Sequence, residues 1–203
     1  MWRCSSRHPP PDPSATPETL FHVNPPSLRS ATTRPTAAAL IAHLGLQKVE
    51  HEGLWFIETY LGTDRIEGEM AARYPGPRRS YSAIYGLTTR LDFSAMHRLA
   101  TDELWHFYAG DPLELLLLHP GGRGEIVIVG PEVFAGQRPQ VRVPRGVWQG
   151  ARPIGGDDAW TLGGYTMAPG FDYADYEPGH RAELQAGWPE FAEMIRSLTR
   201  EAH

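Results

Sequence analysis

The sequence predicts an all-β protein, a sandwich or a small barrel, and three observations support this prediction. Glycine (21 residues) and proline (19 residues) are both used more than average, which is typical of short elements joined by turns. Roughly ten short apolar segments follow at close spacing, and several alternate with a period of two. With 41% hydrophobic residues, the 203-residue chain can bury a sizeable core.

The two ends of the chain differ from its middle. Residues 1–34 are rich in Pro, Ser and Thr and show no hydrophobic period, so we expect a loosely ordered tail there. Residues 35–203 are expected to form one domain. Thr36 as a cap and Gly45 as a stop predict a short helix. Apolar spacing near the C-terminus predicts one or two further helices.

The expected strands lie between turns marked by Gly, Pro and Asp. Alternation on one of them places Tyr81 and Tyr85 on one face and Ser82 and Ile84 on the other. The segments predicted to be strands are 54–60, 66–73, 80–88, 93–99, 103–108, 113–119, 125–129, 140–143, 147–151 and 159–167.

Charge and cysteine content exclude several classes of partner. The formal net charge is -5, and no basic cluster is interleaved with aromatic residues, so nucleic acid is not expected as a partner. The longest leucine run, 115–118, is far too short to span a bilayer, so we expect no membrane association. Cys4 is the only cysteine, which excludes an intrachain disulfide and favours a cytoplasmic location.

Two stretches, 96–110 and 143–149, share a pattern of strand, turn and strand. If they lie side by side in a barrel, His97, Glu103 and Gln149 converge on one interior. A buried imidazole and a buried carboxylate must be paired with each other, solvated by water, or bound to a cation, because an uncompensated charge in the interior is costly.

The first stretch resembles the first sequence motif of the cupins. His97, Glu103 and Gly110 match the motif, while Leu99 stands where the family has a second histidine.

The second stretch resembles the second cupin motif through Pro144 and Gly146, with Gln149 in the place of a histidine. Longer runs resemble the cupin-5 group more closely, and the likeness extends from about residue 35 to residue 176. These runs are 94–98, 102–115, 136–140, 143–149 and 168–172. The resemblance implies a double-stranded β-helix (an RmlC-like cupin jelly roll) and a homodimer. Because the group is a domain of unknown function, it implies no reaction.

One hypothesis for the site is a divalent metal, namely Fe, Mn, Zn or Ni. His97, Glu103 and Gln149 would supply an imidazole, a carboxylate and an amide oxygen. This is a poor set of ligands, since two of the usual three histidines are missing. The alternative is a hydrogen-bonded His–Glu pair without a metal.

A second hypothesis is acid–base catalysis without a metal. Glu103 could orient His97 as a base, and Tyr81 or Tyr85 could donate a proton if it points inward. Epimerases of the same broad fold use a histidine and a tyrosine in such roles, which is a resemblance only. The alternative is that both tyrosines are core residues.

Substrate binding could involve Gln149, Trp105 and Trp148 as part of the pocket, with Arg98 holding an anionic group. Both tryptophans could equally be core or interface residues, and Arg98 could lie on a solvated strand edge.

The leading prediction is a small-molecule enzyme of isomerase, epimerase or lyase type. The alternatives are an Fe- or Mn-dependent dioxygenase and a non-catalytic small-molecule binding protein. A homodimer is also expected, because jelly-roll edges need covering and because we expect no helix of the same chain over apolar side chains such as Ile84 and Leu116.

Overall fold

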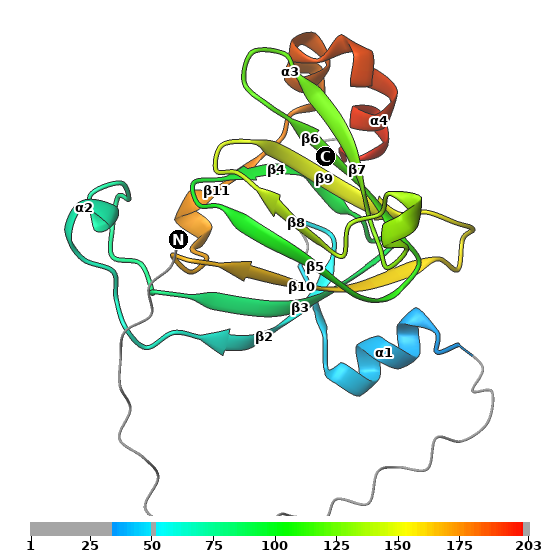
Figure 1. Cartoon of the computed structure of the whole chain (residues 1–203), viewed down its shortest axis with the longest axis horizontal. Coiled ribbons are helices and arrows are strands. Elements are labelled where there is room, and N and C mark those ends of the chain that lie inside the picture. Colours follow the sequence, from blue (N-terminus) through cyan, green and yellow to red (C-terminus); the bar gives the residue numbers. More distant parts are fainter. Residues whose placement is uncertain (1–33, 50–51, 201–203) are drawn as a thin grey trace, which may run out of the picture. The chain divides into compact units, whose positions relative to one another are not determined.

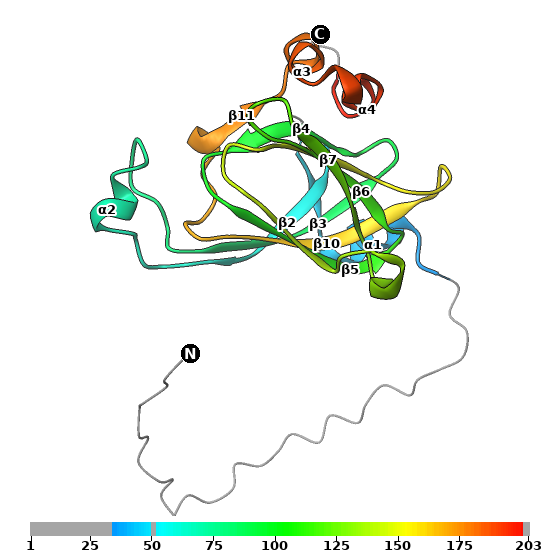
Figure 2. The ribbon, with the colours of Figure 1, turned by 45° about the horizontal axis from the view of Figure 1, so that its top comes forward.

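The computed structural model describes residues 34–49 and 52–200. The predicted N-terminal tail lies outside these residues, apart from Arg34. From Pro35 onward the chain forms one compact unit built on two antiparallel sheets, whose strands curve around a shared interior (Figures 1 and 2). The expected all-β cupin jelly roll with short flanking helices is confirmed.

Each sheet alternates strands from distant parts of the sequence. The six-stranded sheet contains, in spatial order, β1 (Gln47–Lys48), β2 (Trp55–Leu61), β3 (Ser82–Thr89), β10 (Trp160–Met167), β5 (Glu103–Gly110) and β8 (Gln140–Val143). The five-stranded sheet contains β11 (Tyr176–Pro178), β4 (Ser94–Leu99), β9 (Trp148–Pro153), β6 (Leu113–Leu118) and β7 (Gly124–Val129). The consecutive strands β4 and β5 therefore lie in different sheets, so their side chains can meet across the interior.

The main core lies between the two sheets. Trp105 and Tyr165 enter it from the six-stranded sheet, and Leu115 and Val127 enter it from the five-stranded sheet. Burial of such side chains contributes about 1.5–3 kcal/mol each and is the main source of stability.

The helix α1 (Ala37–Leu44) begins and ends where its capping residues predict. The Thr36 hydroxyl accepts a hydrogen bond from the Ala39 N–H at 3.2 Å, and Gly45 ends the helix with a left-handed backbone, φ 68°. The short helix α2 (Gly68–Ala71) replaces the strand predicted over residues 66–73. Gly68 has φ 67°, which breaks an extended chain, and the following Glu, Met and Ala favour a helical turn.

The C-terminal helices α3 (Arg181–Gly187) and α4 (Ala192–Ser197) cover the outer face of the five-stranded sheet (Figure 1). Leu184 and Ile195 pack there against Leu116, which is fully buried. Ile84 points the other way, toward the interior. The expectation that these two side chains need a second subunit is therefore wrong, because the chain covers both itself. Among the described residues, no helix is long and apolar enough to span a membrane.

A buried ion pair joins the segment after β10 to the segment between α2 and β3. Arg78 donates from Nε and Nη2 to the two carboxylate oxygens of Asp175, each at 2.7 Å, and both side chains are 3% exposed. Arg78 also donates from Nη1 to the backbone oxygens of Gly76 and Pro77. Each of the three guanidinium nitrogens thus has a hydrogen-bond partner, as a buried guanidinium requires.

We expect Asp175→Asn to lower the free energy of unfolding by about 3–5 kcal/mol, because it leaves the buried Arg78 charge with only the partly exposed carboxylate of Asp172, 3.7 Å from Nη1. Urea unfolding would measure the change. The matched control is Glu177→Gln, which removes a carboxylate from the exposed bidentate pair with Arg98, where the side chains are 40% and 52% exposed. That change should cost less than about 1 kcal/mol. Equal losses in the two variants would contradict the assignment.

Candidate functional site

The interior of the barrel holds a cavity of about 380 Å³. His97 and Leu99 reach it from β4, and Glu103 reaches it from β5. The remaining walls are mostly apolar. They are formed by Val49, Leu54, Phe56, Ile84, Met167 and Phe171, with Glu52, Glu58, Ser82, Tyr165 and Tyr173 as polar members.

The structure brings together His97, Glu103 and Gln149, the three residues predicted to converge. His97 and Gln149 lie opposite each other on the paired strands β4 and β9. The Gln149 amide nitrogen donates to Glu103 Oε2 at 2.7 Å and to His97 Nε2 at 3.3 Å. Gln149 therefore links the imidazole to the carboxylate, which belong to different sheets.

Trp105 fixes the orientation of the Gln149 amide. Its indole Nε1 donates to Gln149 Oε1 at 2.8 Å and to Glu103 Oε2 at 2.9 Å. Because an indole N–H can only donate, the amide oxygen must face Trp105 and the amide nitrogen must face His97 and Glu103. Trp105 is 3% exposed and is not among the residues that line the cavity, so it supports the site as a core residue and does not offer the substrate contact considered from the sequence.

Both ring nitrogens of His97 are engaged. Nδ1 lies 2.8 Å from the Ala95 carbonyl oxygen and must donate to it, so Nε2 is the acceptor for Gln149. The Tyr176 ring stacks on the imidazole with a centroid separation of 5.3 Å. Burial lowers the pKa of His97 to about 4, and the imidazole is therefore neutral at pH 7.

Burial raises the pKa of Glu103 to about 7, and the hydrogen bonds from Gln149 and Trp105 oppose this rise. Both hydrogen bonds go to Oε2, and no described residue donates to Oε1. Oε1 is also not among the fully enclosed atoms that lack a partner. This oxygen therefore opens into the cavity, where it can meet a ligand.

Glu52 is a second carboxyl group of the cavity that the sequence analysis missed. Burial, and then the charge of Glu103, raise its pKa to about 7. Glu52 precedes β2 in a segment with no period, so no local pattern marked it. Tyr165 was missed as well. Its ring packs edge-on against Trp105 at 4.6 Å, and burial raises the pKa of its hydroxyl.

Tyr81 and Tyr85 do not line the cavity. Their neighbours Ser82 and Ile84 do, and side chains alternate along a strand. Tyr85 is 38% exposed on the outer face, where its ring meets Tyr108 edge-on at 5.9 Å. The prediction that these tyrosines point inward is wrong, because alternation defines two faces without saying which one is buried.

Trp148 and Arg98 also lie outside the barrel. The Arg98 guanidinium sits over the Trp148 ring at 4.5 Å and donates to both carboxylate oxygens of Glu177. Their neighbours His97 and Gln149 take the inward positions. The predicted substrate contacts of Trp148 and Arg98 in the cavity are therefore not supported.

The donors at this site do not fit the Fe, Mn, Zn or Ni centre considered from the sequence. The described residues contain no group of three or more His, Cys, Asp or Glu side chains arranged to hold a metal ion. Gln149 presents its amide nitrogen, and the lone pair of His97 Nε2 already accepts a hydrogen bond from it. A metal ligand needs a free lone pair, so the trio is arranged as a hydrogen-bonded network.

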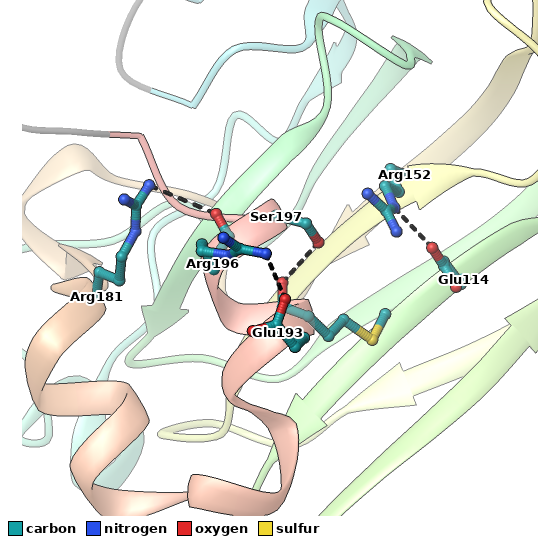
Figure 3. Close-up of a pocket in the computed structure, with 7 residues that line it drawn as sticks. Glu114, Arg152, Arg181, Glu193, Arg196 and Ser197 are labelled. Atoms are coloured by element: carbon teal, nitrogen blue, oxygen red, sulfur yellow. Dashed lines mark hydrogen bonds and ion pairs between the residues drawn. The ribbon is translucent and has the colours of Figure 1, made fainter.

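A second hollow lies on the outside, between the C-terminal helices and β6 and β9 (Figure 3). Four of its charged side chains form two pairs: Arg152 donates to Glu114 at 2.6 Å across two neighbouring strands, and Arg196 pairs with Glu193. Arg181 donates to the backbone oxygens of Arg196 and Thr199. Such pairing is typical of a structural surface, and the chemistry of the chain is better sought in the barrel.

Comparisons with known proteins agree with this architecture. The Cupin_5 family model, described as Cupin superfamily (DUF985), matches residues 38–178. A hypothetical protein from Leishmania major superposes with a TM-score of 0.72 at 30% identity, covering 82% of this chain and 100% of that one. Protein SO0799 from Shewanella oneidensis superposes with a TM-score of 0.73 at 28% identity, covering 83% and 100%. A search of curated proteins found no significant match. The chain belongs to the cupin superfamily, in its DUF985 family.

Proposed function

We propose that this cupin is a small-molecule enzyme that moves a proton within the barrel, in a reaction of isomerase, epimerase or lyase type. One observation carries the proposal. Glu103 presents a free carboxyl oxygen to an apolar cavity, and its pKa of about 7 allows it to take up and release a proton near neutral pH.

The shared step would be removal of a proton from a carbon next to a carbonyl group. The Glu103 carboxylate takes the proton, and the C–H electron pair moves toward the carbonyl oxygen to form an enolate. Return of the proton to the other face gives an epimer, and return to the neighbouring carbon gives an isomer. A lyase instead expels a leaving group from the adjacent carbon with the electron pair.

The other members of the network would position and tune Glu103. Gln149 and Trp105 donate to Oε2 and so stabilise the carboxylate form while Oε1 reacts. His97 accepts from Gln149 and holds its amide in place. This division of roles differs from the sequence prediction, in which His97 itself was the base, because neither ring nitrogen of His97 is left free to face a substrate.

Two alternatives are weaker. The metal-dependent dioxygenase is not supported by the orientation of the donors at His97 and Gln149. A non-catalytic binding protein is favoured by one observation, the complete hydrogen bonding of His97, which a rigid binding pocket would also show. The homodimer and the cytoplasmic location stay predictions.

The test of the proposed function is proton exchange in D₂O. A panel of small uncharged and amine-bearing carbonyl compounds is incubated with the protein, and loss of the C–H signal is followed by ¹H NMR. We expect wash-in of deuterium for at least one compound, and Glu103→Gln should slow it by at least about 100-fold. Glu132→Gln, in an exposed loop, is the control. Compounds that bind in the cavity but never exchange would favour the binding protein instead.

A second prediction concerns stability and pH. The pKa of Glu103 is about 7 in the folded chain against 4.5 for an unperturbed carboxyl group, so its protonated form favours folding. This contribution is present below about pH 4.5 and is lost as the pH rises through about 7. Glu103→Gln keeps an acceptor for both donors and carries no charge. As the pH rises from 4.5 to 8, the free energy of unfolding of the variant should therefore increase by up to about 3 kcal/mol relative to that of the unaltered protein.

Urea unfolding at several pH values would measure this difference. Glu52 is present in both proteins, so the effect of burial on its pKa cancels, whereas the part due to the charge of Glu103 is lost in the variant and adds to the same difference. Parallel stability curves for the two proteins would contradict the raised pKa of Glu103.

A further inference from the structure

Glu52 is held in place by its backbone beside the strand that carries His97. Its carbonyl oxygen accepts a hydrogen bond from the Ala95 N–H at 3.0 Å, and the Ala95 carbonyl in turn accepts from His97 Nδ1. The backbone of Glu52 is thus tied to β4. Its side chain lines the cavity together with His97 and Glu103.

The carboxyl group of Glu52, unlike that of Glu103, has no partner among the described residues, and it is more buried than that of Glu58, the third carboxyl group of the cavity. His97, Gln149, Trp105 and Glu103 hydrogen-bond with one another. No described residue forms a hydrogen bond or an ion pair with the Glu52 carboxyl group. Polar groups inside proteins are nearly always paired, so a partly buried carboxyl group without a partner points to a donor that comes from a ligand.

The charge of the cavity defines what that donor can be. Glu52 and Glu103 both line the wall, and no lysine or arginine does so among the described residues. The guanidinium of Arg200 lies close by but is directed elsewhere, since it donates to the Phe93 carbonyl oxygen at 3.3 Å and lies over the Phe93 ring. An anion would meet the carboxyl groups of Glu52, Glu103 and the more exposed Glu58 and no described cation, whereas a cation would be attracted.

The remaining walls define the body of the ligand. Side chains such as Leu54, Phe56, Ile84 and Phe171 offer apolar and aromatic surface. They suit a compact apolar skeleton and offer few partners to a heavily hydroxylated one.

We propose that the cavity binds small molecules with a protonated amine on an apolar skeleton, and that Glu52 is the residue that receives the amine. The inference names the substrate class of the proposed function, and it rests on that function only in taking the cavity as the place of reaction. Glu52 would determine specificity, while Glu103 stays available for the proton.

The test uses the full chain at neutral pH and three probes with one skeleton: benzylamine, benzyl alcohol and benzoate. The indole N–H resonance of Trp105, which hydrogen-bonds to Glu103, reports binding by ¹H–¹⁵N NMR. We expect benzylamine to bind at least about tenfold more tightly than benzyl alcohol, and benzoate more weakly than both. No shift with benzylamine, or equal affinity for benzoate, would overturn the inference.

Variants then assign the preference to Glu52. Glu52→Gln should remove the roughly tenfold advantage of benzylamine while benzyl alcohol binding stays within about twofold, which also shows that the cavity is intact. Glu52→Asp keeps the charge and should retain part of the advantage. Glu177→Gln makes the same chemical change on the outside and should leave the affinities unchanged. An unchanged preference in Glu52→Gln would assign it to another residue.

The outcomes separate this inference from the proposed function. Selective amine binding through Glu52 without deuterium exchange in any compound would refute the enzyme and leave the ligand class standing. Deuterium exchange at a rate that depends neither on the charge of the compound nor on Glu52→Gln would refute the amine preference and leave the proposed enzyme standing.

Discussion

The site depends on one hydrogen bond that can form in only one direction. The indole N–H of Trp105 can only donate, so it fixes which end of the Gln149 amide faces His97 and Glu103. A glutamine would otherwise be free to present its oxygen, as a metal ligand would. With the amide held this way, the imidazole lone pair is occupied and one carboxyl oxygen remains for chemistry. A single core tryptophan thus arranges the three residues as a hydrogen-bonded network and not as a set of metal ligands.

The second constraint is the burial of two carboxyl groups in a cavity whose described lining contains no lysine or arginine. Burial raises the pKa values of Glu52 and Glu103 toward neutrality, and no described cation in the cavity lowers them again. The hydrogen bonds from Gln149 and Trp105 reach only Glu103. The two groups are therefore chemically different although their pKa values are similar. Glu103 accepts hydrogen bonds from the protein, whereas the Glu52 carboxyl group has no partner among the described residues. In the proposed function, this difference assigns the proton transfer to Glu103 and the binding of the amine to Glu52.

The sequence predicted the fold well because its signals were local. Capping residues marked α1, alternation marked most strands, and the two motif stretches predicted that His97, Glu103 and Gln149 converge on one interior. Tyr85 was misplaced because a period of two identifies two faces and not the buried one. Glu52 was missed because it lies in a segment without a hydrophobic period, and only the folded structure places it in the same cavity as Glu103. The covering of Leu116 by the C-terminal helices was likewise a long-range contact that local patterns do not carry.

The C-terminal helices have a consequence for where the folding unit ends. The family match stops at residue 178, just before α3 begins at Arg181. Yet Leu116 and Leu118 depend on Leu184, Ile195 and Leu198 for their burial. A chain shortened to the matched region would expose these apolar side chains on the five-stranded sheet and would be prone to aggregation. The barrel therefore needs α3 and α4 to keep this apolar face from solvent and from other molecules.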